Sequence, residues 1–257
     1  FNSLSDYDKA TFIFNCLSFA NTTLGILVNL LTFLVFCRKR FNEYSFTLYF
    51  QVMTLSNIIV ISHAYRLFAR FIFGALIETT NEMMCKFSRY ILFVACSISV
   101  WLLCAIAFDR LFSIAFSKKF SFFKKKWFQI LVVIIILAYS FILYIMMPIY
   151  YHRVFVFSTG DSKNITLTFC VMDIVKENIL YWIDFINISL PTFVVNNVAT
   201  LLTIGFIYKS RNKVKANEMV LQTNQVTSKK DRKFAFNSIM LNLISFALKT
   251  PILLINL

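Results

Sequence analysis

The sequence predicts an α-helical membrane protein with several spans, from its composition and from the arrangement of its apolar residues. Of the 257 residues, 59% are hydrophobic and 15% are charged, and the mean hydropathy is +0.71. A soluble domain of this size does not need so much apolar surface. The apolar residues also form separate runs that reach the roughly 20 residues a helix needs to cross a bilayer. Continuous runs exclude the alternating pattern of a membrane β-barrel.

The distribution of charge predicts how the spans are oriented. The net charge is +14, which would suggest a nucleic-acid partner only if position were ignored. Residues 37–45, 109–126 and 209–233 contain 17 of the 26 Lys and Arg residues but only four acids. The positive-inside rule places these loops in the cytoplasm and the N-terminus outside, as in a multi-pass plasma-membrane protein. The same loops can contact anionic lipid.

We expect six spans within a single domain, residues 1–257. The spans are approximately residues 11–36, 46–73, 82–115, 127–150, 179–208 and 230–257. The chain begins with Phe and has no cleavable signal segment, so we expect it to be a fragment or a trimmed chain.

The first two spans each carry an asparagine at mid-depth, Asn29 and Asn57. An isolated asparagine in a membrane most often hydrogen-bonds to a neighbouring helix. The first span must begin before Leu24, because the remainder is too short to cross the bilayer. The glycosylation sequon at Asn21 is therefore expected to lie inside the helix and to be unmodified.

The third span, residues 82–115, ends in the triplet Asp109-Arg110-Leu111. Charges at the inner end of a span are costly unless paired, and they usually mark function. Asp109 can hold Arg110 locally, and Asp231 at the inner end of the sixth span can reach it across the bundle. Such a pair would tie two spans together in a resting state. The alternative is an interfacial arginine and an unrelated loop acid.

The fourth span ends near Pro148, and the long outer loop 151–178 follows it. Two β-rich stretches in this loop flank turn residues, which predicts a short extracellular β-hairpin. Asn164 lies in a sequon within the turn, which is expected to be outside and exposed.

Two cysteines are expected on the outer, oxidising side, Cys85 and Cys170. A disulfide between them would hold the hairpin over the mouth of the bundle. The alternative is two free thiols.

The fifth and sixth spans contain Pro191 and Pro251, which are expected kink sites. Lys249 is a cation at membrane depth, which by default indicates function. Asp184 on the fifth span could pair with Lys249, or both could contact a ligand. Snorkelling or a purely structural pair is the alternative.

These residues together resemble the pattern of rhodopsin-like (class A) G-protein-coupled receptors. The resemblance depends on Asn29, Cys85, Asp109-Arg110-Leu111, Cys170, Pro191 and Pro251, whose order and spacing follow the family pattern along nearly the whole chain. It implies a seven-helix receptor bundle, of which this chain holds six spans. It also implies ligand binding at the outer mouth, outward movement of the sixth span, and docking of a heterotrimeric G protein at Arg110.

Several positions depart from the family pattern. Leu111 stands where a tyrosine is usual, and Asn57, with Ser99 as its neighbour, stands where the family has a sodium-binding aspartate. We therefore expect weak or no sodium regulation. Lys249 and Ser245 replace the usual tryptophan and phenylalanine of the sixth span. These replacements alter the family's activation switches.

The resemblance also bears on the ligand. Leu92 occupies the position at which amine receptors carry an aspartate, so a biogenic amine is not expected. The outer hairpin resembles that of peptide receptors, which favours a peptide ligand. The candidate pocket comprises Leu92, Cys96, Asp184 and Lys249.

Two other classes of function remain open. Six spans could be half of a transporter, although the four glycines do not form a broken-helix pattern. The altered sixth span is compatible with a receptor-like protein that does not signal. An enzyme is not expected, and neither is a cofactor, because there is no Gly-rich phosphate loop, no metal-ligand cluster and only two histidines.

Overall fold

The structure is a computed structural model in which helices dominate. It describes residues 6–39, 46–63, 81–115, 125–160, 163–195, 197–199, 201–206 and 208. In this part of the chain, four segments are long and apolar enough to cross a membrane, namely Phe12–Phe36, Glu82–Phe112, Lys126–Tyr150 and Ile174–Phe206. These agree with the first, third, fourth and fifth expected spans. Residues 64–73 of the second span and all of the sixth span lie outside the described residues.

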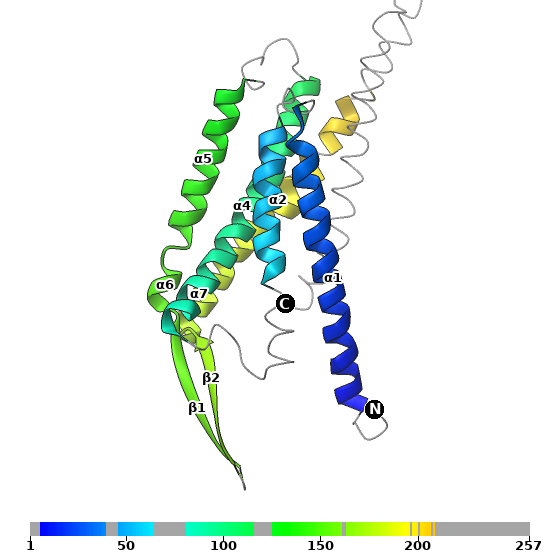
Figure 1. The fold of residues 1–257 in the computed structure, drawn as a ribbon. Helices are drawn as coiled ribbons and strands as arrows, with labels where there is room; N and C mark the ends of the chain where they lie inside the picture. Colours follow the sequence, from blue (N-terminus) through cyan, green and yellow to red (C-terminus); the bar gives the residue numbers. More distant parts are fainter. Residues whose placement is uncertain are drawn as a thin grey trace, which may run out of the picture.

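Helices α1 (Asp6–Phe36) and α2 (Thr47–Ser62) pack side by side, as Figure 1 shows. Gly25 lies where they approach closely, because a Cβ atom added there would be 3.2 Å from Cδ1 of Ile61. Small residues commonly allow this kind of close packing between membrane helices. Helix α2 is apolar but shorter than the four spanning segments.

Helix α4 (Glu82–Ala115) is the most buried of the four spanning segments. It packs against α2 on one side and against α5, α6 and the helix that follows the sheet on the others. Its inward residues form much of the apolar core, and Leu102 in its middle is completely buried. Because α4 contacts nearly every other element, its two ends position the features described below.

Helix α5 (Lys126–Leu143) is interrupted by a turn at residues 144–146 before the single turn of α6 (Met147–Tyr150). Pro148 lies in the first turn of α6, where its missing N–H costs nothing, but an unbroken helix through this position would lose a hydrogen bond. The hydroxyl of Tyr90 in α4 donates to the carbonyl of Phe141 at 3.0 Å. This bond satisfies a carbonyl near the end of α5.

Strands β1 (His152–Gly160) and β2 (Lys163–Val171) pair antiparallel, from His152 opposite Val171 to Gly160 opposite Lys163. Their β-branched and aromatic residues favour extended backbone. The sheet extends from the end of the bundle where α6 and α7 lie, and the N-terminus of α1 lies toward the same end (Figure 1). We call this end the sheet end.

The last described helix widens twice into π-helical turns. Helix α7 (Ile174–Asp184) continues as η4 (Phe185–Ser189) and η5 (Pro191–Val195). Pro191 cannot donate a backbone hydrogen bond, so the helix must rearrange around it. The hydroxyl of Thr192 donates to the carbonyl of Ile188 at 2.6 Å, which satisfies a backbone acceptor near the proline.

Candidate functional site

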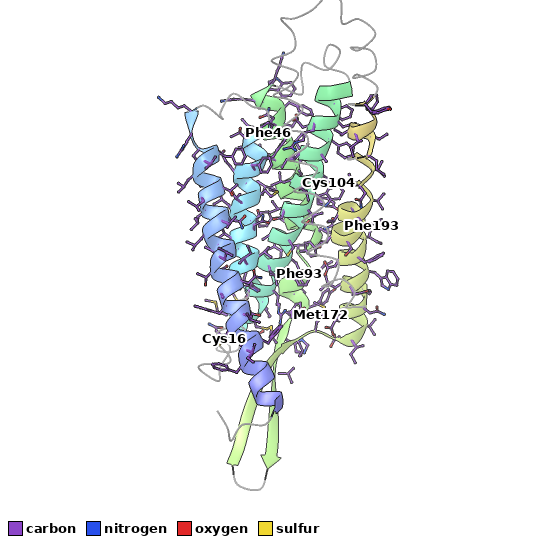
Figure 2. The ribbon with its side chains drawn as sticks, turned by 90° about the vertical axis from the view of Figure 1, so that its right-hand side faces the viewer. Cys16, Phe46, Phe93, Cys104, Met172 and Phe193 are labelled. Atoms are coloured by element: carbon purple, nitrogen blue, oxygen red, sulfur yellow. A yellow bond between two sulfur atoms is a disulfide. The ribbon has the colours of Figure 1, made fainter. Side chains whose placement is uncertain are left out.

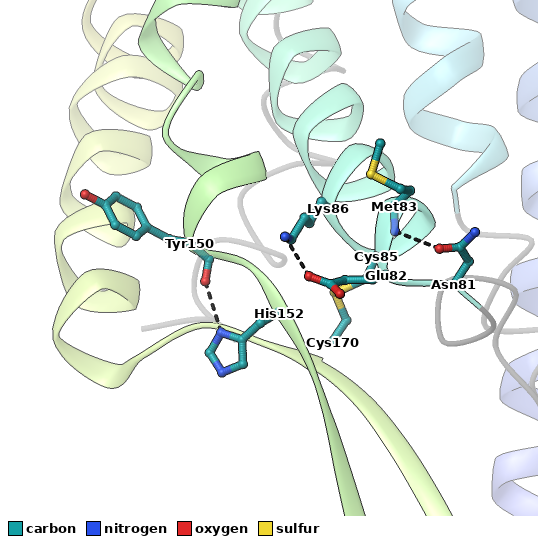
Figure 3. Close-up of polar contacts among 8 residues, drawn as sticks. All are labelled: Asn81, Glu82, Met83, Cys85, Lys86, Tyr150, His152 and Cys170. Carbon is teal, nitrogen blue, oxygen red and sulfur yellow. Dashed lines mark hydrogen bonds and ion pairs between the residues drawn. A yellow bond between two sulfur atoms is a disulfide. The ribbon is translucent and has the colours of Figure 1, made fainter.

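At the sheet end, a disulfide joins Cys85 in α4 to Cys170 in β2 (Figure 3). Their Cα atoms are 5.7 Å apart although 85 positions separate them in the sequence. Cys85 is fully buried. The bond attaches the sheet to the first turn of the central helix, and this pairing agrees with the sequence prediction.

Charged side chains surround this attachment in short local pairs. Lys86 and Glu82 are 2.7 Å apart on the first turns of α4 (Figure 3). Lys176 lies 2.9 Å from Asp173 and 4.2 Å from the centre of the Tyr150 ring, so it joins the start of α7 to α6. The hydrogen bond and the charge of Lys176 lower the pKa of Asp173. Ion pairs this exposed contribute little stability, so the disulfide is a stronger link between the sheet and α4 than these pairs are.

The two mid-span asparagines that the sequence singled out meet in the structure. Nδ2 of Asn57 donates to Oδ1 of Asn29 at 3.3 Å, and Nδ2 of Asn29 donates to the carbonyl of Gly25 at 2.8 Å. Ser99 is buried on α4, and its hydroxyl has no hydrogen-bond partner within the described residues. The structure thus links the two asparagines across α1 and α2 and records no bond from either of them to Ser99.

A buried amide joins α4, α5 and η4. Oδ1 of Asn187 accepts hydrogen bonds from Nε1 of Trp101 at 2.7 Å and from the Tyr139 hydroxyl at 2.9 Å. Its Nδ2 donates to Ser97 at 3.0 Å and to the Tyr144 hydroxyl at 3.1 Å. Asn187 is only 3% exposed, so these four bonds satisfy a group that has almost no access to water or lipid.

Two further bonds extend this network. Ser97 and Ser140 share a hydrogen bond of 2.9 Å between α4 and α5, and both side chains are fully buried. The hydroxyl of Tyr144 donates to Oδ1 of Asp184 at 2.7 Å. We call the six residues Ser97, Trp101, Tyr139, Ser140, Tyr144 and Asn187 the Asn187 cluster.

Three of the four predicted pocket residues are described. Asp184 is half-buried and accepts a hydrogen bond from the Tyr144 hydroxyl, and Cys96 is half-buried on α4. Leu92 is half-buried on α4, one helical turn before Cys96. Lys249 lies outside the described residues.

The opposite end of the bundle holds the Asp109-Arg110-Leu111 triplet. Asp109 is 7% exposed and Leu111 is 8% exposed, so both are buried. The guanidinium carbon of Arg110 lies 5.7 Å from the ring centre of Phe46 and 6.0 Å from that of Phe50, at the start of α2. Figure 2 shows Phe46 far from Met172 at the sheet end. Asp231 and Pro251 lie outside the described residues.

The aromatic neighbours of Arg110 form a cluster with the end of α1. The rings of Phe36 and Phe50 stack at 4.7 Å with an interplanar angle of 11°, and Phe46 meets each of them edge-on, at 6.3 Å and 5.9 Å. Nε2 of Gln51 donates to the carbonyl of Phe36 at 3.0 Å, which ties the last turn of α1 to α2. We call Phe36, Phe46 and Phe50 the inner aromatic cluster.

Comparison with known proteins does not name a family. No model of a protein family matches the sequence, and a search of curated proteins finds no significant match. Among the described residues, no three His, Cys, Asp or Glu side chains are grouped so that they could hold a metal ion.

Sequence reasoning missed the two most connected groups. Asn187 was not among the residues that the sequence singled out, although an asparagine flanked by apolar residues within a span is itself a sign of interhelical bonding. No sequence pattern indicates the inner aromatic cluster, because its members come from two helices. Its contact with Arg110 depends on how α4 packs against those helices.

Proposed function

We propose that this chain is the membrane domain of a rhodopsin-like G-protein-coupled receptor. In this proposal an extracellular ligand, with a peptide favoured, binds at the sheet end, and a heterotrimeric G protein binds at Arg110. The protein would lie in the plasma membrane with its N-terminus and its β-hairpin outside.

The observation that carries the proposal is the pair of features at the two ends of α4. Cys85 forms the disulfide to the sheet, and Arg110 lies 25 positions later on the same helix. At ~1.5 Å per residue this separation is about 37 Å, which exceeds the ~30 Å hydrocarbon core. One continuous helix therefore connects the tethered sheet with an arginine, over a distance long enough for the two to lie at opposite faces of a membrane.

The local chemistry of each end supports the assignment of sides. A disulfide is stable on the oxidising side of a membrane and rare in the cytosol. The basic residues Arg38 and Lys39 follow α1 at the Arg110 end, as expected of a cytoplasmic loop. An arginine at that end is the kind of charge that a transducer can expose to a partner.

The test is G-protein activation by the full-length protein in cells, both basal and driven by a peptide library. Arg110→Ala should remove both activities while surface expression stays unchanged. Arg38→Ala is the matched control, because it removes an exposed cation from the same end. Full activity of Arg110→Ala would contradict the proposal. Expression at the surface without any coupling in the wild type would favour the non-signalling alternative.

A further inference from the structure

The inner aromatic cluster presents two ring faces to a cationic side chain. The guanidinium carbon of Arg110 is within about 6 Å of both the Phe46 and the Phe50 centroids, the range over which a ring face attracts a cation. Arginine favours such stacking because its charge is spread over a plane and is weakly hydrated. The contact therefore gives the guanidinium a defined position.

The cluster that forms this contact is held rigidly. Phe36 stacks on Phe50 from the last turn of α1, and Gln51 fastens that turn through the Phe36 carbonyl. Phe46 is 7% exposed and immediately precedes α2. Three rings from two helix ends thus form one platform, and Arg110 reaches it from α4.

We propose that Phe46 and Phe50 are positioning residues for Arg110. Their rings hold the guanidinium on the α2 side of the inner end in the resting protein, and Arg110 must leave them to bind a partner. The consequence for signalling rests on the proposed function, whereas the contact itself does not. The inner aromatic cluster on α1 and α2 would thus hold Arg110 in addition to the expected pair between Arg110 and Asp231.

The contact is tested by fluorinating Phe50, which weakens the negative face of the ring with little change in its size. Monofluoro-, difluoro- and trifluorophenylalanine are incorporated at position 50 of the full chain, and the midpoint of thermal unfolding in detergent is measured. We expect the midpoint to fall stepwise, by about 2 °C at the trifluoro variant. In an Arg110→Met background the same series should be flat. Arg110→Gln replaces this background if Arg110→Met does not fold.

A matched series at Phe93 controls for the effect of fluorine itself. Phe93 packs at 5.7 Å against the Tyr144 ring on the same bundle, so its series should not depend on Arg110. The proposal would be overturned if fluorination of position 50 lowered the unfolding midpoint equally in the wild-type and Arg110→Met backgrounds. The rings would then act by packing alone. A flat series in both backgrounds would overturn it as well.

Measurements of G-protein activation distinguish a failure of this inference from a failure of the proposed function. If the protein couples to a G protein, the trifluoro variant at position 50 should raise basal activity about threefold to fivefold, because it destabilises the resting position of Arg110. Unchanged basal activity with normal ligand-driven coupling would overturn the positioning role while leaving the receptor proposal intact. A third outcome is that fluorination lowers the unfolding midpoint only when Arg110 is present, while the protein activates no G protein. The receptor proposal then fails and the contact stands.

Discussion

The indole nitrogen of Trp101 donates to the side-chain oxygen of Asn187 at 2.7 Å, joining the centre of α4 to the π-helical segment η4. The same amide bonds to Ser97, Tyr139 and Tyr144. In lipid no water can replace such partners, so an amide that is fully bonded fixes which helix faces meet. The Asn187 cluster is therefore the point at which α4, α5 and η4 are held in register.

Replacing Asn187 should destabilise the bundle more than any other single polar change among these helices. Asn187→Leu removes four hydrogen bonds and leaves the half-buried Trp101 and the exposed Tyr139 without the acceptor of their donor groups. Interhelical hydrogen bonds in membranes average ~0.6 kcal/mol, so four contribute about 2.4 kcal/mol. The unsatisfied Trp101 donor adds about 1 kcal/mol, so we expect a loss of roughly 3–4 kcal/mol.

Thermal unfolding of the purified protein measures this loss, with a thiol dye reporting exposure of the buried Cys104. Asn197→Leu is the matched control, since within the described part of the chain that amide bonds only to the Phe193 carbonyl of its own helix. A midpoint for Asn187→Leu equal to that of Asn197→Leu would show that the cluster does not hold the helices together.

Tyr144 connects the Asn187 cluster to Asp184 through its hydroxyl. Tyr144→Phe keeps the ring contact with Phe93 but deletes the donor to Asp184 and the acceptor for Asn187. We expect a loss of about 1–2 kcal/mol, smaller than that of Asn187→Leu. In a double-mutant cycle with Asn187→Leu, the losses of unfolding free energy should be less than additive, because both substitutions remove the same hydrogen bond. Full additivity of the unfolding midpoints would contradict this connection.

The sequence predicted those parts of the molecule that depend on local pattern. Apolar run length predicted four segments that the structure shows to be long enough to span a membrane, and Pro148 lies near the end of the third of them. The meeting of Asn29 and Asn57 could be expected because a mid-span asparagine needs a partner. Asn187 was different, since the sequence does not show that its face of the helix turns toward α4 and α5. Pro191 predicts a kink in this helix, but it does not predict that the backbone widens into the two π-helical turns beside it.

The surroundings of Arg110 show the same limit. A charge at the end of a span is visible in the sequence, and an acid was the natural partner to expect. The rings of Phe46 and Phe50 are two of 31 phenylalanines, and nothing local distinguishes them from rings that face lipid. Only the packing of α4 against α2 brings them to the guanidinium.

Gly25 should matter because of its position against α2. A Cβ there would lie 3.2 Å from the flexible tip of Ile61, so Gly25→Ala should be nearly neutral, with helix propensity offsetting the crowding. Gly25→Leu should cost about 1–3 kcal/mol, because a branched side chain separates the helices. The matched control is Gly205→Leu, since nothing lies within 4 Å of that position among the described atoms.

A second variant makes the Gly25 prediction specific. Ile61→Ala opens space opposite Gly25, so the pair Gly25→Leu with Ile61→Ala should recover part of the lost unfolding midpoint. If Gly205→Leu and Gly25→Leu shift the midpoint equally, close packing of α1 on α2 is not the cause.

The disulfide should stabilise the sheet end as a single unit. Cys85→Ala, Cys170→Ala and the double variant should lower the unfolding midpoint by the same amount, because each removes the same bond. The cost should be about 2–5 kcal/mol, the usual range for loss of a native disulfide. Cys16→Ala and Cys37→Ala, at exposed free cysteines, should leave the midpoint unchanged. A larger loss in the double variant than in either single one would argue against a shared bond.

Glycosylation at Asn164 tests which face of the membrane carries the sheet. Asn164 pairs with Thr159 in the next-to-last step of the ladder, six residues before the disulfide-bonded Cys170. If this end faces the secretory lumen, the sequon should be modified, and Asn164→Gln should remove a mobility shift that peptide-N-glycosidase also removes. Thr166→Ala should act in the same way and Thr166→Ser should not, since serine preserves the sequon. Asn21→Gln should change nothing, because Asn21 lies within the spanning segment Phe12–Phe36, out of reach of the transferase. If neither Asn164→Gln nor peptide-N-glycosidase changed the mobility of the protein, the sheet end would not face the secretory lumen.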